Sequence, residues 1–147
     1  MMTSLYSLAP VHVWRDNDHD VLTFEWFGIA PIGVELRELF DMTLELAQTE
    51  RRRSSAPDRP LDWYFDLRHL LICNSADINW LSLSWLPRVL AAGGPAPVFV
   101  LPEGPLRAAL HPGGRALRAD SYPRAAESFR PDPRDPFAGA PYLFRAA

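Results

Sequence analysis

Three residues of the kinds used in acyl-transfer chemistry lie close together in this sequence: Asp66, His69 and Ser75. A serine acts as a nucleophile when a histidine takes its proton and an aspartate orients that histidine. Closeness in sequence arises easily by chance, and the sequence contains no Gly-x-Ser-x-Gly turn of the hydrolase type. We therefore predict no catalytic residue and expect a protein that is not an enzyme.

A second cluster with chemical potential is the acidic run Asp16-x-Asp18-x-Asp20, which copies the first three ligand positions of a calcium-binding loop. Such a loop needs Gly at its sixth position and Glu at its twelfth, where this chain has Val21 and Phe27. We therefore interpret the run as a polar turn. The histidines also lack metal-ligand spacing, so we predict neither a metal nor a cofactor; they are His12, His19, His69 and His111.

The composition excludes further kinds of chemistry. All 15 basic residues are Arg, which rules out Schiff-base mechanisms and phosphate loops that need Lys. The 18 acidic residues leave a net charge of −3, without the broad positive field that nucleic-acid binding needs. With one cysteine, no secretory signal and no apolar run of about 20 residues, we expect a cytoplasmic protein that spans no membrane.

The elements that must position these residues begin with two β-prone runs, Val11–Arg15 and Val21–Phe27, on either side of the polar turn. These runs predict a β-hairpin. After a break at Gly28, Pro31 favours the first turn of a helix. Apolar residues at helical spacing predict that this helix is amphipathic and ends at the triple Arg; they are Leu36, Leu39, Phe40, Thr43, Leu44 and Ala47.

Two unbroken apolar runs, Leu61–Leu67 and Val98–Leu101, predict central strands that are parallel to each other. The segment between them has helical periodicity up to Ala92, and Pro87 is expected either to kink this helix or to free a backbone carbonyl locally. Cys73 ends an apolar run and is expected to be buried. Further on, we expect a helix over Pro105–Leu110, an edge strand over Ala116–Ala119 and a helix over Pro123–Phe129.

Four tryptophans have two interpretations. Aromatic side chains at strand or helix spacing are most often part of the core. The alternative is that they line an apolar pocket for a small ligand. The residues concerned are Trp26, Trp63, Trp80 and Trp85.

The stretch from Leu61 to Pro102 carries a resemblance to a known family. Its strand Trp63-Tyr64-Phe65-Asp66-Leu67, its Asn74-Ser75-Ala76 segment and its second strand follow the order of the STAS domain of anti-sigma factor antagonists. Asp66-Leu67-Arg68, Trp85-Leu86-Pro87 and Ala91-Ala92-Gly93 look like a group of uncharacterised bacterial STAS-like proteins. That group shares its superfamily with the CRAL-TRIO lipid carriers.

The resemblance implies a candidate modification site. In anti-sigma factor antagonists, a serine in an Asp-Ser-Ser-Gly motif at the start of the corresponding helix is phosphorylated by the partner kinase. Ser75 matches that serine, but the glycine is absent and Asp77 adds a negative charge nearby. We interpret Asn74 and Ser75 first as a helix cap, and Ser75 second as a phospho-acceptor.

Together, these patterns predict an α/β domain over residues 1–130 and a proline-rich tail over residues 131–147. The resemblance implies a mixed four- to five-stranded sheet with helices mainly on one face. It also implies a non-catalytic regulatory or protein-interaction domain with a protein partner. The alternative is a domain that binds a small apolar ligand or lipid, as the CRAL-TRIO carriers do. The tail and the N-terminal hairpin are candidate surfaces for a homodimer.

Overall fold

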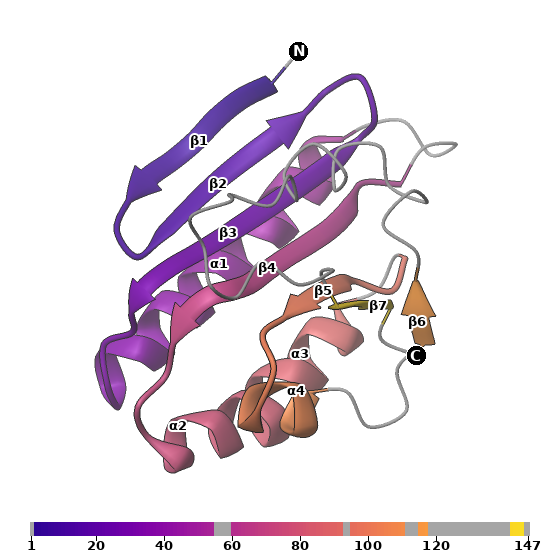
Figure 1. Cartoon of the computed structure of the whole chain (residues 1–147). Helices are drawn as coiled ribbons and strands as arrows, with labels where there is room; N and C mark the ends of the chain where they lie inside the picture. Colours follow the sequence, from indigo (N-terminus) through magenta and orange to yellow (C-terminus); the bar gives the residue numbers. More distant parts are fainter. Residues whose placement is uncertain (1, 55–59, 93–94, 111–114, 118–141, 146–147) are drawn as a thin grey trace, which may run out of the picture.

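The computed structural model describes residues 2–54, 60–92, 95–110, 115–117 and 142–145. It contains one mixed sheet of seven strands in the order β1-β2-β3-β4-β5-β7-β6 (Figure 1). β3, β4 and β5 are parallel to one another, and all other neighbouring pairs are antiparallel. The strands are β1 (Met2–Leu8), β2 (Val11–Asp16), β3 (Val21–Ile29), β4 (Asp62–Leu71), β5 (Val98–Leu101), β6 (Arg115–Leu117) and β7 (Tyr142–Arg145).

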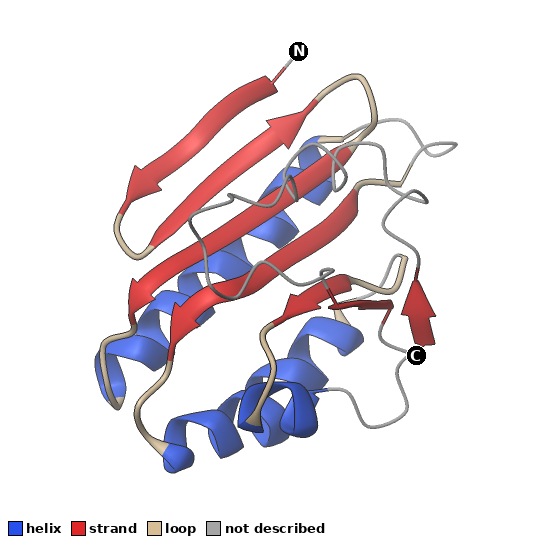
Figure 2. Cartoon of the chain, viewed as in Figure 1, coloured by secondary structure: helices blue, strands red, loops and turns tan. Residues whose placement is uncertain are grey.

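The helices that connect the parallel strands lie on one face of this sheet (Figure 2). One helix joins β3 to β4, and a continuous helical segment with a π-helical turn joins β4 to β5. The predicted α/β class with a mixed sheet is confirmed, with β1 and β7 as strands beyond those expected. The helices are α1 (Val34–Arg53), α2 (Ser75–Trp80), the π-helical turn η1 (Leu81–Trp85), α3 (Leu86–Ala91) and α4 (Pro105–Leu110).

The predicted hairpin is confirmed as β2 and β3, which pair antiparallel with Val13 opposite Phe24. Leu22, Phe24 and Trp26 are alternate residues of β3, and all three are buried. Alternate residues of a strand point to the same face of a sheet. This face of the hairpin therefore forms part of the core beneath α1.

Helix α1 begins at Val34, so the expected start at Pro31 is wrong. Gly33 is the N-cap residue, with φ 64° and ψ −127°. A residue with a side chain rarely adopts this conformation, and glycine therefore sets the point at which the chain turns into the helix. The predicted apolar stripe and the basic last turn are confirmed.

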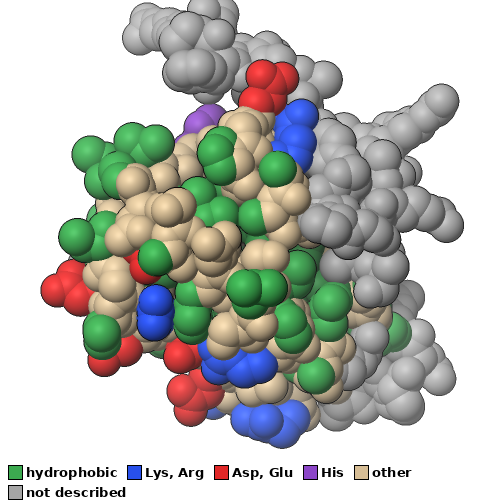
Figure 3. All heavy atoms as spheres, turned by 90° about the horizontal axis from the view of Figure 1, so that it is seen from below, with side chains coloured by type: hydrophobic (Ala, Val, Ile, Leu, Met, Phe, Trp, Pro, Cys, Tyr) green, Lys and Arg blue, Asp and Glu red, His purple; other side chains and the backbone are tan. Residues whose placement is uncertain are grey.

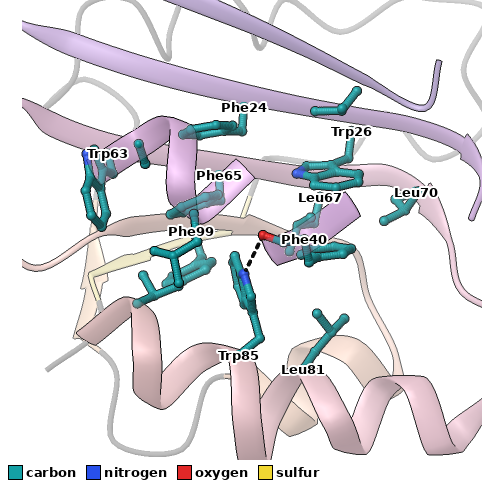
Figure 4. Packing of buried hydrophobic residues seen from close by; sticks show 14 of the residues in the cluster. Phe24, Trp26, Phe40, Trp63, Phe65, Leu67, Leu70, Leu81, Trp85 and Phe99 are labelled. Carbon is teal, nitrogen blue, oxygen red and sulfur yellow. Dashed lines mark hydrogen bonds between the residues drawn. The ribbon is translucent and has the colours of Figure 1, made fainter. Parts of the chain in front are cut away.

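The core is an aromatic stack between the sheet and the helices (Figure 4). Trp26 of β3 stacks on Phe40 of α1, with ring centroids 4.0 Å apart. Trp85 of η1 meets Phe40, Phe65 and Phe99 edge-on. The Trp85 indole Nε1 donates a hydrogen bond of 3.1 Å to the Phe40 carbonyl oxygen. Trp85 therefore joins α1 to the helical segment after β4.

The residues just before Pro87 form the π-helical turn η1, a local departure from the regular α-helix. The Leu86 backbone N–H donates to the Leu81 carbonyl oxygen, five residues back. Proline lacks a backbone N–H, and its ring clashes with the carbonyl oxygen four residues before it in a regular helix. A widened turn immediately before Pro87 relieves this conflict. Leu81, Trp85 and Val89 are buried and face the core.

The end of the chain contributes to the same sheet. β7 pairs antiparallel with β5, with Phe144 opposite Phe99, and β6 pairs with β7. β7 lies within the predicted tail over residues 131–147, and it is a strand of the same sheet. The predicted helix over Pro105–Leu110 is confirmed as α4, and β6 confirms an edge strand at the expected place. The helix expected over Pro123–Phe129 lies outside the described residues.

Candidate functional site

The candidate site lies at the end of the sheet where β3 and β4 stop. Because the two strands are parallel, they end at the same edge, and the helices that follow them begin there. Ile29 and Leu71 are opposite each other at the end of this pairing. The Ala30 backbone N–H donates to the Leu71 carbonyl oxygen at 2.8 Å. The backbone of the two loops is therefore held together where they leave the sheet.

A buried carboxylate connects the two helix starts. Asp77, in the first turn of α2, is 1% exposed. One of its carboxylate oxygens accepts the Gly33 backbone N–H at 3.1 Å. The N-terminus of a helix carries a partial positive charge, so a carboxylate placed there stabilises the helix. Asp77 thus stabilises the first turn of α2 and the start of α1 together, and its charge points into the protein rather than towards the surface.

Asn74 is the cap of α2, which confirms one of the two interpretations of the Asn74-Ser75 pair. Its side-chain oxygen accepts the Ala76 backbone N–H at 2.8 Å. Ser75 is the first residue of α2 and is exposed. Because Asn74 supplies the cap, the Ser75 side chain is not needed for that purpose. The assignment of Ser75 as a phospho-acceptor remains a prediction.

Four exposed aliphatic side chains lie at the ends of β3 and β4 and in the connection from β3 to the start of α1. We call these four side chains the sheet-end surface, and each of them is more than half exposed. Hydrophobic side chains gather on the face of the molecule seen from below (Figure 3). The members of the sheet-end surface are Ile29 (73% exposed), Ile32 (62%), Val34 (68%) and Leu71 (58%).

Cys73 is exposed, so the expectation that it is buried is wrong. The reason is that β4 ends at Leu71, before the apolar run ends. Leu70 is buried, whereas Leu71 points to the other side and Cys73 lies in the connection to α2. Apolar character alone did not distinguish a strand interior from the loop that follows it.

The sequence interpretation missed the sheet-end surface. The segment Gly28-Ile29-Ala30-Pro31-Ile32-Gly33-Val34 contained a usable signal, because it places aliphatic residues in a stretch broken by glycine and proline. Gly28 and Gly33 both have positive φ, at 78° and 64°. Ile29 is the last residue of β3, Ile32 lies in the loop, and Val34 is the first residue of α1. None of the three lies in the interior of a strand or helix, where neighbouring elements would cover its side chain.

The four tryptophans occupy separate places rather than one common lining. Trp26 and Trp85 are in the aromatic stack, and Trp63 is buried beneath the Arg51 guanidinium, 3.5 Å from its ring centroid. Trp80 is half-buried between the guanidinium groups of Arg37 and Arg88, at 5.6 and 5.7 Å. The core interpretation is confirmed for Trp26, Trp63 and Trp85. The apolar-ligand alternative stays a prediction without support from these contacts.

In the group Asp66, His69 and Ser75, the aspartate is bonded to Arg68 and not to the histidine. Asp66 is buried on β4, and its two carboxylate oxygens accept hydrogen bonds of 3.1 and 3.0 Å from the Arg68 guanidinium. His69 is exposed, and Ser75 is exposed on α2. Burial, together with the Asp66 charge, raises the pKa of Tyr64, so this phenol stays protonated. Asp66 therefore forms a partly buried ion pair with Arg68, whose side chain is 18% exposed.

The acidic run between β2 and β3 is a turn stabilised by its own first residue. The Asp16 carboxylate accepts the backbone N–H groups of Asp18 and His19 at 3.0 and 3.3 Å. It also lies 2.9 Å from the His19 ring Nδ1. Burial acts to raise the pKa of Asp16, but these hydrogen bonds outweigh it and lower the pKa below its usual value. The carboxylate that would begin a calcium loop is thus engaged within the turn.

Within the described part of the chain, no cluster of three or more His, Cys, Asp or Glu side chains is arranged to hold a metal ion. The described helices are also too short or too polar to cross a membrane. In comparisons with known proteins, no family model, curated protein or solved structure matches this chain.

Proposed function

We propose that this chain is a non-catalytic protein-interaction domain that binds its partner through the sheet-end surface. The observation that carries the proposal is the exposure of four aliphatic side chains on a backbone held by internal hydrogen bonds. Contiguous exposed apolar side chains are typical of interaction sites. A fixed backbone lowers the entropy lost on binding, which favours affinity.

The resemblance to anti-sigma factor antagonists supports a regulatory form of this proposal. Ser75 is exposed at the start of α2, the helix that follows β4, and a phosphate on its hydroxyl would add a charge of about −2 there. The Asp77 carboxylate is buried and bonded to the Gly33 backbone N–H, so it is directed into the protein, whereas Ser75 is exposed. We include a cytoplasmic location in the proposal, because an exposed, unpaired Cys73 fits a reducing compartment.

The experiment is affinity capture from a lysate of the native host, with the tagged chain and three single variants. Ile32→Glu and Leu71→Glu place a charge on the sheet-end surface. Leu83→Glu is the matched control, because Leu83 is 78% exposed on η1, outside that surface. Exposed positions tolerate the change, so circular dichroism and thermal melts should match those of the wild type.

We expect a specific partner that the wild type and Leu83→Glu capture equally. Its affinity should fall about tenfold or more in Ile32→Glu and Leu71→Glu, as for charges placed in an apolar contact. Equal capture by all four proteins would contradict the proposal. Intact mass of host-purified protein and the Ser75→Asp variant test the regulatory form: unmodified Ser75 and an unchanged affinity would remove it.

A further inference from the structure

The strand β1 forms one edge of the sheet, far along the sheet from β6 at the other edge (Figure 1). Among the described residues, it pairs with β2 and with no other strand. The backbone N–H and carbonyl groups on its outer side therefore face away from the sheet. Such an edge is a template for pairing with a further strand.

The β1 edge lacks the features that commonly prevent such pairing. Proteins block exposed edges with charged residues, prolines or very short strands. Met2–Leu8 spans seven residues and contains neither a charged residue nor a proline. Met2, Thr3, Ser4 and Ser7 are exposed, which leaves this edge accessible.

An irregularity in β1 determines which register is compatible with a further strand. The pairing with β2 shifts between Ser4 and Tyr6, and both Leu5 and Tyr6 pack against the core. Two adjacent residues therefore share the helix-covered face. Ser4 is opposite Trp14 and Ser7 is opposite His12, two positions of β2 that share the other face.

We infer that two copies of this chain join through antiparallel pairing of their β1 strands, with the two-fold axis between Leu5 and Tyr6. Residues opposite each other in an antiparallel pair must point to the same face. In this register Leu5 of one copy meets Tyr6 of the other on the helix-covered face, and Ser4 meets Ser7 on the other face. Every position from Ser4 to Ser7 then has a partner on its own face.

A second copy is the occupant that this edge fits best. From Ser4 to Ser7 the strand is self-complementary in this register, because Leu5 meets Tyr6 and Ser4 meets Ser7, and the strand contains no charged residue that could oppose a like charge. A two-fold axis perpendicular to the sheet joins the two sheets into one and keeps the helices of both copies on the same side. The dimer also leaves the sheet-end surface of each copy free, so the inference is independent of the proposed function.

The test places like or opposite charges at two exposed positions, Ser4 and Ser7. The dimer dissociation constant is measured by sedimentation velocity over a concentration series of the full chain. The double variant S4K/S7K places the lysine at position 4 of one copy opposite the lysine at position 7 of the other, twice per dimer. The matched variant S4K/S7E changes the same residues but places opposite charges there. The wild type and S4K/S7E should be dimers, and the dimer dissociation constant of S4K/S7K should be about tenfold higher than that of S4K/S7E.

Circular dichroism shows whether each variant is folded, and S4E/S7E repeats the like-charge arrangement if S4K/S7K does not fold. A monomeric wild type at all concentrations would overturn the inference and leave the edge to a strand from another protein. A wild-type dimer with equal dissociation constants for S4K/S7K and S4K/S7E would also overturn it, because the copies would then meet elsewhere.

Discussion

Replacing Asp77 should weaken the whole domain, because its carboxylate stabilises two helix starts. In Asp77→Ala, the Gly33 backbone N–H loses its acceptor at 3.1 Å, and a buried position loses its polar group. A hydrogen bond to a charged group contributes about 1.5–3 kcal/mol. We therefore expect the free energy of unfolding to fall by about 2 kcal/mol. For a chain of this length, this corresponds to a decrease in Tm of about 4–8 °C.

Asp77→Asn separates the hydrogen bond from the charge. The amide oxygen still accepts from Gly33, but the interaction with the positive ends of α1 and α2 is lost, which costs about 0.3–1 kcal/mol. Glu38→Ala is the control, because it removes one negative charge at an exposed position of α1 and should change stability by less than about 0.5 kcal/mol. The expected order of stability is Glu38→Ala, then Asp77→Asn, then Asp77→Ala.

The assays are urea unfolding and hydrogen exchange at the Gly33 amide. Exchange at this amide should become much faster in Asp77→Ala and change little in Asp77→Asn. The reasoning is refuted if Asp77→Ala is as stable as Glu38→Ala, or if the Gly33 amide keeps its wild-type protection in Asp77→Ala.

Three further predictions concern the turn, the core and the helix start. Because folding lowers the pKa of Asp16, its charged form stabilises the folded protein above the usual pKa near 3.8, and this stabilisation is lost as the pH falls through the lower folded-state pKa. In Asp16→Asn, the free energy of unfolding should therefore decrease less steeply as the pH is lowered through this range. Trp85→Phe should cost about 1 kcal/mol more than Trp26→Phe in urea unfolding, because the Trp26 Nε1 has no hydrogen-bond partner among the described residues; equal losses would contradict this. Gly33→Ala should lower stability by about 1–3 kcal/mol through backbone strain alone, because its Cβ would meet no atom within 4 Å; an unchanged Tm would disprove it.

The sequence was most informative where a single physical cause acts over a short range. Alternation in Val21–Phe27 and the apolar stripe of α1 follow from side-chain periodicity, which is local. The N-cap at Asn74 follows from the chemistry of one side chain. These elements, with the parallel pairing of β4 and β5, account for the confirmed α/β class.

The missed features depend on contacts between distant parts of the chain. β7 is a strand because it pairs with β5, which it reaches from the far end of the sequence. The role of Asp77 depends on Gly33, which lies a whole helix and strand earlier. No local pattern encodes such pairings.

The candidate site shows the same division. Residue type and spacing were sufficient to identify Asn74 and Ser75 as the start of a helix, because capping involves only neighbouring backbone groups. The exposure of Ile32 and Leu71 became evident only when β3 and β4 were paired in parallel and ended at one edge. An aliphatic residue is buried or exposed according to what packs over it, and this depends on the folded chain as a whole.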